Sequence, residues 1–110
     1  MEMALGMTGS EASDTGFRGS DQGYQMKTNY GWNAFTNGTN SSGFSGLPGG
    51  VRQLNGTFFN AGDDGNFWSS SPNGPNAWYR KLSYLYPDDV YRFSEPPRNG
   101  YSVRCVRDAE

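Results

Sequence analysis

Two pairs of adjacent carboxylates, Asp63 with Asp64 and Asp88 with Asp89, could support acid–base chemistry or cation binding. Both pairs lie beside glycine or proline, in segments typical of turns, where acidic side chains more often cap backbone amides or face water. Residues 63–66, Asp-Asp-Gly-Asn, are rich in oxygen ligands but lack the spacing of an EF-hand. We therefore predict no catalytic residue, no metal site and no cofactor.

The residue types that are missing exclude several other kinds of chemistry. The 110 residues contain no histidine, which removes the usual general base, the usual zinc ligand and the Ser-His-Asp triad. The single cysteine, Cys105, has no partner for a CxxC site or a disulfide, and no glycine-rich phosphate loop follows a predicted strand. The net charge of −2 gives no field that would attract nucleic acid or an anionic membrane. We expect neither an enzyme nor a nucleic-acid-binding protein.

Alternation in the C-terminal third predicts the sheet that must position any binding residues. Successive side chains of a strand point to opposite faces, so in residues 78–84 the even positions fall on one face, which we interpret as the core side. Further strands are predicted near Phe67, over residues 90–93 and over residues 101–106. The short connections favour antiparallel pairing. The predicted core-facing side chains are Trp78, Arg80, Leu82, Tyr84, Tyr101, Val103 and Cys105.

The odd-numbered side chains, with those of the adjacent turns, are typical of a binding surface. Tyrosine provides a large contact area at a small entropic cost, and serine adapts its hydrogen bonds. Alternatively, the aromatic residues close the rim of a small core. Both interpretations stay open for Tyr79 and Phe93, whereas we favour binding for Tyr91. The candidate ligand-binding residues are Tyr79, Lys81, Ser83, Tyr86, Asp88, Asp89, Tyr91, Phe93 and Glu95.

The first half of the chain predicts short helices followed by a long loop. Thr8 and Glu11 fit a capping box, which indicates a helix near residues 10–15, and residues 19–26 predict a second helical turn with Ser20 as its cap. Successive turn signals then make residues 28–50 a loop. The side chains expected to anchor this loop to the core are Trp32, Phe35, Phe44 and Leu47.

A hairpin is predicted for residues 51–59, with its turn at Asn55-Gly56. The chain has the length of one domain, residues 1–110, and shows no repeat or low-complexity linker. Aromatic residues make up 15% of it, so a few large rings can supply the core that a modest aliphatic content cannot. We expect an α+β domain.

Several runs carry a family resemblance: residues 42–50, 65–70, 76–80, 90–92 and 100–108, with 4–7, 16–19 and 26–27 upstream. Together they resemble the Fibrobacter succinogenes major paralogous domain. That family is similar to the C-type-lectin-like fold in its formylglycine-generating-enzyme variety. The same type of domain carries the variable region of many diversity-generating retroelement proteins of gut bacteria and their phages. The resemblance implies short helices, a twisted antiparallel sheet and long ordered loops.

The resemblance also implies which positions are scaffold and which are variable, because adenine-specific mutagenesis rewrites codons on a fixed scaffold in those proteins. The implied scaffold positions are Trp68, Ser69, Trp78, Arg80, Leu82, Val90, Arg92, Val103, Arg104 and Cys105. The implied ligand-facing positions are Tyr79, Ser83, Tyr86, Asp88, Asp89, Tyr91, Phe93 and Ser94, so Ser94 joins the candidates.

The sequence departs from the chemistry of the resembling proteins at two points. The enzymes of that superfamily oxidise a substrate with a cysteine pair, and Cys105 has no partner. Calcium-dependent sugar binding in C-type lectins requires an amide where residues 95–97 read Glu-Pro-Pro. We therefore expect neither activity.

Non-catalytic recognition of a protein or glycan ligand is the function that we predict, as the display domain of a cell-surface protein or phage receptor-binding protein. The alternative is a structural or assembly module, and an oligomer is compatible with both. We expect an extracellular, cell-surface or virion location. The sequence has no targeting signal and no apolar run for direct membrane insertion, and its N-terminus looks short for the family, as in the C-terminal part of a longer protein.

Overall fold

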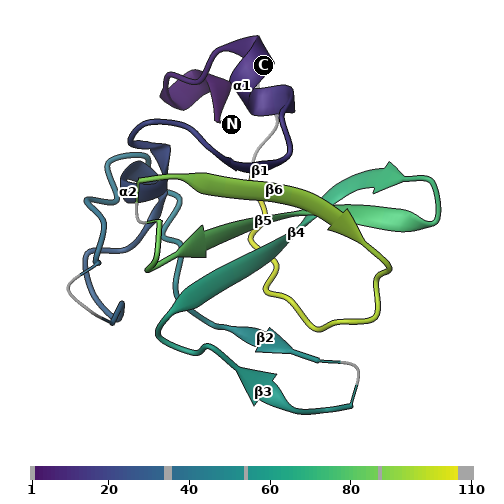
Figure 1. Ribbon diagram of the computed structural model, residues 1–110. Coiled ribbons are helices and arrows are strands. Elements are labelled where there is room, and N and C mark those ends of the chain that lie inside the picture. The colour runs from purple at the N-terminus through teal and green to yellow at the C-terminus, as the bar shows by residue number, and fades with distance from the viewer. Residues whose placement is uncertain (1, 34–35, 54, 87, 107–110) are drawn as a thin grey trace.

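The computed structural model describes residues 2–33, 36–53, 55–86 and 88–106. Within these residues the fold is mixed and mostly β-sheet, with two short α-helices (Figure 1), which confirms the predicted α+β class. The elements, in chain order, are the 3-10 helix η1 (Met3–Leu5), α1 (Gly9–Ser13), β1 (Gly16–Arg18), α2 (Gln22–Met26), β2 (Val51–Arg52), β3 (Phe58–Phe59), β4 (Asp64–Asn73), β5 (Asn76–Ser83) and β6 (Val90–Glu95).

Four strands form the main sheet in the order β1-β6-β5-β4, and each neighbouring pair is antiparallel, as predicted. The β4–β5 hairpin pairs Asp64 with Ser83 at its open end and has a register irregularity between Trp68 and Pro72. The strands β2 and β3 form a separate two-stranded sheet. Figure 1 shows this small hairpin at the opposite end of the molecule from η1 and α1.

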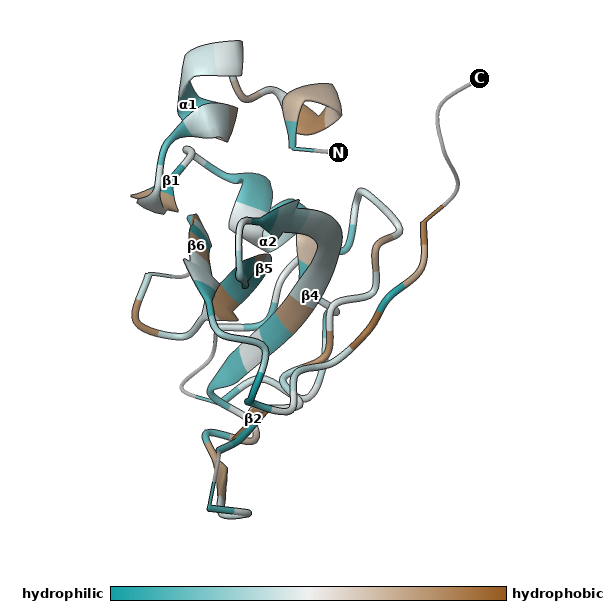
Figure 2. Cartoon of the chain, turned by 90° about the vertical axis from the view of Figure 1, so that its right-hand side faces the viewer, coloured by the Kyte–Doolittle hydropathy of each residue, from teal (hydrophilic) through white to brown (hydrophobic). Residues whose placement is uncertain are grey.

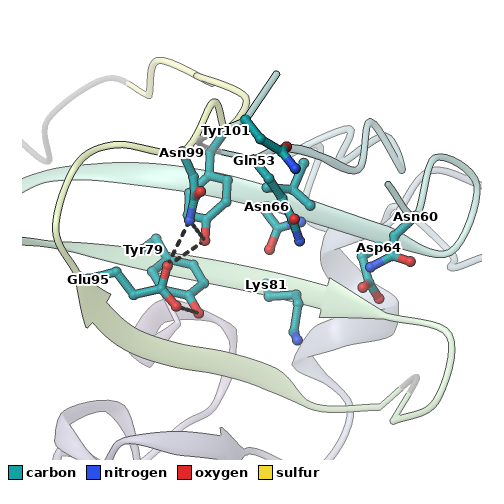
Figure 3. Close-up of a pocket in the computed structure, with 11 residues that line it drawn as sticks. Gln53, Asn60, Asp64, Asn66, Tyr79, Lys81, Glu95, Asn99 and Tyr101 are labelled. Carbon is teal, nitrogen blue, oxygen red and sulfur yellow. Dashed lines mark hydrogen bonds between the residues drawn. The ribbon is translucent and has the colours of Figure 1, made fainter. Parts of the chain in front are cut away.

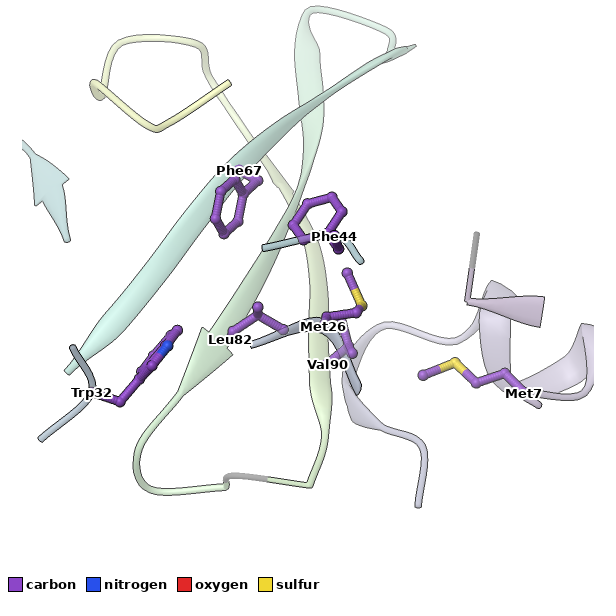
Figure 4. Packing of buried hydrophobic residues seen from close by; sticks show 7 residues of the cluster. All are labelled: Met7, Met26, Trp32, Phe44, Phe67, Leu82 and Val90. Atoms are coloured by element: carbon purple, nitrogen blue, oxygen red, sulfur yellow. The ribbon is translucent and has the colours of Figure 1, made fainter. Parts of the chain in front are cut away.

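One face of the main sheet packs the core. Leu82 of β5 and Val90 of β6 are completely buried there, and the predicted core position of Leu82 is confirmed. Side chains from α2 and from the long loop cover this face (Figure 4). Aromatic rings and methionines supply most of the buried apolar area, as expected for a chain with few aliphatic residues. The cluster contains Met7, Met26, Trp32, Phe44, Phe67, Leu82 and Val90.

The start of α1 follows local capping chemistry, whereas the N-cap of α2 makes no side-chain hydrogen bond. The Glu11 amide donates to the Thr8 hydroxyl at 3.1 Å and the Thr8 amide donates to the Glu11 carboxylate at 3.4 Å, which confirms the predicted capping box. The helix α1 ends at Ser13, two residues earlier than predicted. The helix α2 has Asp21 rather than Ser20 as its N-cap.

Lys27 joins the long loop to the end of β5. Its side chain is completely buried, and Nζ donates to the Ser83 carbonyl oxygen at 2.7 Å and to the Thr36 carbonyl oxygen at 3.4 Å. The ring of Trp32 lies 4.6 Å from the ammonium group. Burial lowers the pKa of Lys27 to about 8, and nearby carboxylates oppose this shift.

Two of the four predicted loop anchors are confirmed. Trp32 and Phe44 are buried, with 5% and 8% of their surface exposed. Leu47 is exposed instead, because its backbone carbonyl rather than its side chain lies against Gly65 of β4. Phe35 lies outside the described residues.

The strand predicted over residues 101–106 does not form. Ser102 makes one parallel bridge to Phe67 at the edge of β4, and residues 103–106 belong to no strand or bridge. Val103 and Cys105 are exposed, so the prediction of core-facing scaffold positions here is wrong. Alternation cannot reveal whether a segment stays paired with its neighbour. The edge strand β4 continues to Asn73, but the chain leaves this edge after Ser102, and Arg104 donates to the Phe44 carbonyl oxygen of the long loop instead. Figure 2 shows this part of the chain running outside the sheet.

Candidate functional site

The face of the main sheet opposite the core carries most of the predicted binding residues. Cross-strand partners share a face, and β5 pairs Lys81 with Tyr91 and Tyr79 with Phe93 of β6. Because β4 pairs with β5, alternate side chains of β4 lie on the same surface. The side chains on this face are Phe17, Asp64, Asn66, Trp68, Tyr79, Lys81, Ser83, Tyr91, Phe93 and Glu95.

A polar pocket lies on this face, between the main sheet, the β2–β3 hairpin and the segment that follows β6 (Figure 3). Its volume is about 570 Å³, within the range of roughly 300–1,000 Å³ found for small-molecule sites. We call this cavity the polar pocket. It is lined by Val51, Gln53, Asn55, Asn60, Asp64, Asn66, Tyr79, Lys81, Glu95, Asn99 and Tyr101.

Glu95 is the most strongly held side chain of the polar pocket. Its carboxylate accepts hydrogen bonds from the Tyr101 hydroxyl at 2.8 Å, the Asn99 amide at 3.2 Å and the Tyr79 hydroxyl at 3.3 Å. Burial, followed by the hydrogen bond to Glu95, raises the pKa of Tyr101 to about 12. Burial raises the pKa of Tyr79 as well, so both phenols remain donors at neutral pH. The result is a fixed carboxylate acceptor.

The opposite wall of the polar pocket combines the carboxyl group of Asp64, the ammonium group of Lys81 and the buried amide of Asn66. Burial raises the pKa of Asp64, and Lys81 opposes this shift. The Asn66 side chain is 4% exposed and donates to the Gly50 carbonyl oxygen at 3.2 Å. This bond ties the start of the β2–β3 hairpin to β4 and holds the amide at the pocket.

Gly50 lets the chain before β2 approach the end of β3 closely. Its φ of 73° lies in the left-handed region, and a Cβ at this position would collide with the carbonyl oxygen of Phe59. The Gly50 amide donates to the Asp64 carbonyl oxygen at 2.8 Å. A glycine is therefore required at position 50, where the chain enters the β2–β3 hairpin that borders the polar pocket.

An aromatic surface continues from the polar pocket across β6 and β1. Lys81 connects the two, because its Nζ lies 4.7 Å from the centre of the Tyr91 ring. The rings of Tyr91 and Phe93 are stacked with centres 6.0 Å apart, and Phe17 contacts both Tyr91 and Tyr86. We call the four residues Phe17, Tyr86, Tyr91 and Phe93 the aromatic shelf. Phe93 is 43% and Tyr86 52% exposed.

Two candidates that were expected to face solvent are buried. Tyr79 is 5% exposed because Trp68 and Tyr101 pack against its ring, with centres 6.1 and 4.8 Å away. Ser83 is 2% exposed, and its hydroxyl accepts from the Leu85 amide at 3.1 Å in the turn after β5. Strand parity assigned both side chains to the correct face, but the expected exposure of Ser83 is wrong. The burial of Tyr79 favours the alternative in which its ring closes the rim of a core. Tyr79 still lines the polar pocket.

The remaining candidates lie apart from the polar pocket. Tyr86, Asp88 and Asp89 follow β5 and line a second cavity of about 180 Å³. Ser94 lies on the core side of the sheet, as the partner of Trp78 in β5, and its hydroxyl accepts from the Asn73 amide at 3.0 Å. The structure thus brings together Tyr79, Lys81 and Glu95 in the polar pocket and places Tyr91 and Phe93 beside it.

Sequence reasoning missed most of the side-chain amides of the polar pocket. Asp64 and Asn66 were noted for a possible cation, and their spacing of two along a strand puts them on one face. The amides from the hairpin and from the segment after β6 gave no local signal, because only the tertiary fold brings them to β5. The prediction that Tyr101 faces the core is wrong, because its ring lines the polar pocket. The lining residues that were not among the ligand-binding candidates are Val51, Gln53, Asn55, Asn60, Asp64, Asn66, Asn99 and Tyr101.

Two further properties follow from the part of the chain that the structure describes. Within it, no three acidic, cysteine or histidine side chains are grouped closely enough to hold a metal ion. None of its helices has the length and apolar character needed to cross a membrane.

A four-stranded antiparallel sheet with short helices, and with a polar pocket on the face opposite the core, defines a small mixed domain of mostly β structure. The chain belongs to the Fibrobacter succinogenes major domain family, whose sequence model matches residues 1–107. Comparison with the curated proteins and with the solved structures gave no significant match.

Proposed function

We propose that this domain recognises a ligand without catalysis, through the polar pocket and the adjoining aromatic shelf. The observation that carries this proposal is the convergence of amide, carboxylate, ammonium and phenol groups around one open cavity. Tyr91 and Phe93 extend the same face as partly exposed rings. Aromatic side chains beside adaptable polar groups are typical of binding surfaces.

The hydrogen bonds of the polar pocket favour binding over bond-breaking chemistry. Glu95 already accepts from three donors, two of which are phenols with raised pKa values. A carboxylate held in this way is a poor general base, because three of its lone-pair sites already accept hydrogen bonds from protein donors. The same bonds make it a pre-oriented acceptor for a ligand hydroxyl or amide.

The sequence resemblance extends this proposal to a C-type-lectin-like scaffold of the kind used by diversity-generating retroelements. The separation between a core face and a ligand face supports it, since Leu82 can stay constant while Tyr91 and Phe93 vary. Tyr79 supports it less, because its ring is buried and its hydroxyl is bonded to Glu95. A genomic copy of the codons for residues 67–108 that differs only at adenines would establish diversification.

Such a protein would act on a cell surface or a virion, with a bacterial surface component as its ligand. The exposed thiol of Cys105 allows attachment of a fluorophore, and binding to a panel of intact gut bacteria can then be measured by flow cytometry. We expect binding to at least one strain. We also expect Glu95→Gln in the polar pocket and Phe93→Ser in the aromatic shelf to reduce it.

The matched control is Ser10→Ala, an exposed position in α1 at the other end of the molecule from the β2–β3 hairpin (Figure 1). This variant should bind as the wild type does. Absence of binding to every strain, or equal binding by the two site variants, would contradict ligand recognition by this face.

A second candidate function is assembly with another subunit, and the exposed rings of β3 favour it. Phe58 is 74% and Phe59 45% exposed on a two-stranded hairpin outside the main sheet. Sedimentation velocity over a range of concentrations would reveal an oligomer. If the hairpin forms the interface, Phe58→Ser should convert that oligomer to monomer.

A further inference from the structure

We infer that the polar pocket and the aromatic shelf together bind a neutral oligosaccharide, with one sugar unit in the pocket and the next on the shelf. This inference rests on the proposed recognition function and specifies the chemical class of the ligand. It follows from the polarity of the pocket lining, from its charge and from the position of the shelf.

The pocket lining requires a ligand with many hydrogen-bonding groups. Five lining residues carry side-chain amides, a group with both donors and an acceptor. Asn66 and Asn99 already donate to protein groups, so Gln53, Asn55 and Asn60 supply the amide donors for a ligand. Val51 is the single aliphatic residue of the lining, whereas small-molecule sites are usually lined mostly by apolar side chains. Neighbouring hydroxyl groups of a sugar, which both donate and accept, match such a lining. The amides belong to Gln53, Asn55, Asn60, Asn66 and Asn99.

Glu95 retains capacity for one ligand hydroxyl. A carboxylate has about four lone-pair sites, and the donors Tyr79, Asn99 and Tyr101 occupy three of them. Two of these bonds go to Oε2, so the remaining site is on Oε1, which accepts only from Tyr79 among the described residues. A sugar hydroxyl that donates to Oε1 would complete the set.

The charge of the pocket disfavours an anionic ligand. Asp64 and Glu95 contribute two negative charges and Lys81 contributes one positive charge, which leaves the lining at −1. The ammonium of Lys81 also lies against the Tyr91 ring, which partly satisfies it. A carboxylate or phosphate on the ligand would meet net repulsion, and a neutral sugar would not.

The aromatic shelf adjoins the pocket and provides the second subsite. Phe93 pairs with Tyr79 and Tyr91 pairs with Lys81, so both shelf rings lie directly beside lining residues. The face of an aromatic ring is electron-rich, and it attracts the polarised C–H groups on the flat side of a sugar ring. Phe93 is 43% exposed, which leaves its ring available for such a contact. A ligand that uses both surfaces must have at least two sugar units.

A peptide is the main competing ligand, and the lining argues against it. An extended peptide gains specificity from pockets that receive alternate side chains. The polar pocket offers one aliphatic side chain to an apolar residue of a peptide. The shelf alone could take such a residue, but that peptide would gain no hydrogen bond from the amides of the pocket.

Treatment of the cells that bind the labelled domain separates this inference from the proposed function. Periodate cleaves the neighbouring diols of sugars, whereas a protease removes surface proteins. We expect binding to be lost after periodate treatment and to survive protease treatment. Loss after protease alone would overturn the sugar inference and leave recognition intact, whereas no binding to untreated cells would contradict recognition itself.

A glycan array that displays neutral and acidic oligosaccharides of matched length, with the corresponding monosaccharides, tests the ligand class directly. We expect binding to neutral oligosaccharides in preference to acidic ones. Binding to acidic glycans alone, or binding to no glycan by a domain that does bind cells, would overturn the inference.

Two variants assign the subsites on the same array. The Gln53 side chain lines the pocket and makes no hydrogen bond to another described residue, so Gln53→Ala can remove a ligand contact without unfolding the protein. It should weaken binding to every neutral glycan by about three- to tenfold, the effect of one hydrogen bond. Phe93→Ser should weaken binding to oligosaccharides but not to monosaccharides. If Gln53→Ala and Phe93→Ser bound the oligosaccharides with the same affinity as the control Ser10→Ala, the two-subsite arrangement would be contradicted.

Discussion

The Glu2 carboxylate joins the N-terminus to the central strand of the sheet, because Arg80 Nε donates to it at 2.9 Å across 78 positions of sequence. Its second oxygen accepts from Arg18 at 3.1 Å. The side chains of Arg18 and Glu2 are 4% and 10% exposed. One carboxylate therefore neutralises two buried or half-buried guanidinium groups.

Removal of this carboxylate should destabilise the fold strongly. Glu2→Ala would leave both guanidinium groups without an anion, and Arg18 Nε and Arg80 Nη1 already have no partner among the described residues. Breaking a buried pair in this way costs about 3–5 kcal/mol. Urea denaturation followed by tryptophan fluorescence would measure the loss. Glu11→Ala is the matched control, because it removes an exposed hydrogen bond from the Thr8 amide at 3.4 Å, and it should cost about 1 kcal/mol or less.

Replacement by alanine should lower the free energy of unfolding far more at Gly50 than at Gly43. Both residues have a positive φ, 73° and 74°, so both substitutions carry the same backbone strain. A Cβ at Gly50 would collide with the Phe59 carbonyl oxygen, whereas nothing lies within 4 Å of a Cβ at Gly43. We expect Gly43→Ala to cost about 1–2 kcal/mol, the cost of a left-handed conformation with a Cβ, and Gly50→Ala distinctly more. Equal losses in the free energy of unfolding would contradict the close approach of Gly50 to the end of β3.

The stability of the protein should depend on pH through Lys27. Burial lowers its pKa from 10.5 to about 8 in the folded state, so between these values the unfolded chain binds more protons. The contribution of this group to stability is therefore present above pH 10.5 and is lost as the pH falls towards 8, with an upper limit of about 3 kcal/mol. The free energy of unfolding of the wild type, measured relative to Lys27→Met, should rise from pH 8 to pH 10. A pH-independent difference would argue that the ammonium is solvated.

The phenol of Tyr101 should titrate late and report on Glu95. Its pKa is raised to about 12, first by burial and then by its hydrogen bond to the Glu95 carboxylate. Stability from this group is present below the ordinary tyrosine value and is lost as the pH rises towards 12. Ultraviolet absorbance of phenolate can follow the titration, with Tyr101→Phe to identify the signal. We expect Glu95→Gln to move the pKa of Tyr101 towards its ordinary value.

If Glu95→Gln left the late titration unchanged, burial alone would raise the pKa and the hydrogen bond would contribute little. Such a result would also weaken the case for Glu95 as a fixed acceptor in the polar pocket. The titration needs no ligand, so it tests the construction of the site separately from its function.

Local sequence determined the elements whose cause lies within a few residues. The Thr8–Glu11 capping box and the hairpin around Asn55 both formed where their side chains predicted them, because hydrogen bonds between near neighbours produce them. The alternation along β5 also assigned Leu82 to the core side, since a strand has a period of two.

Tertiary structure decided what covers each face. Tyr79 is buried by Trp68 and Tyr101. The residues around Val103 remain outside the sheet because the chain leaves the edge of β4 after Ser102 and Arg104 bonds to the long loop at Phe44. The amides of the polar pocket come from segments far apart in the chain, so no local pattern marks them. Strand parity is a property of consecutive residues, but burial and the assembly of a site depend on long-range packing, which only the folded chain defines.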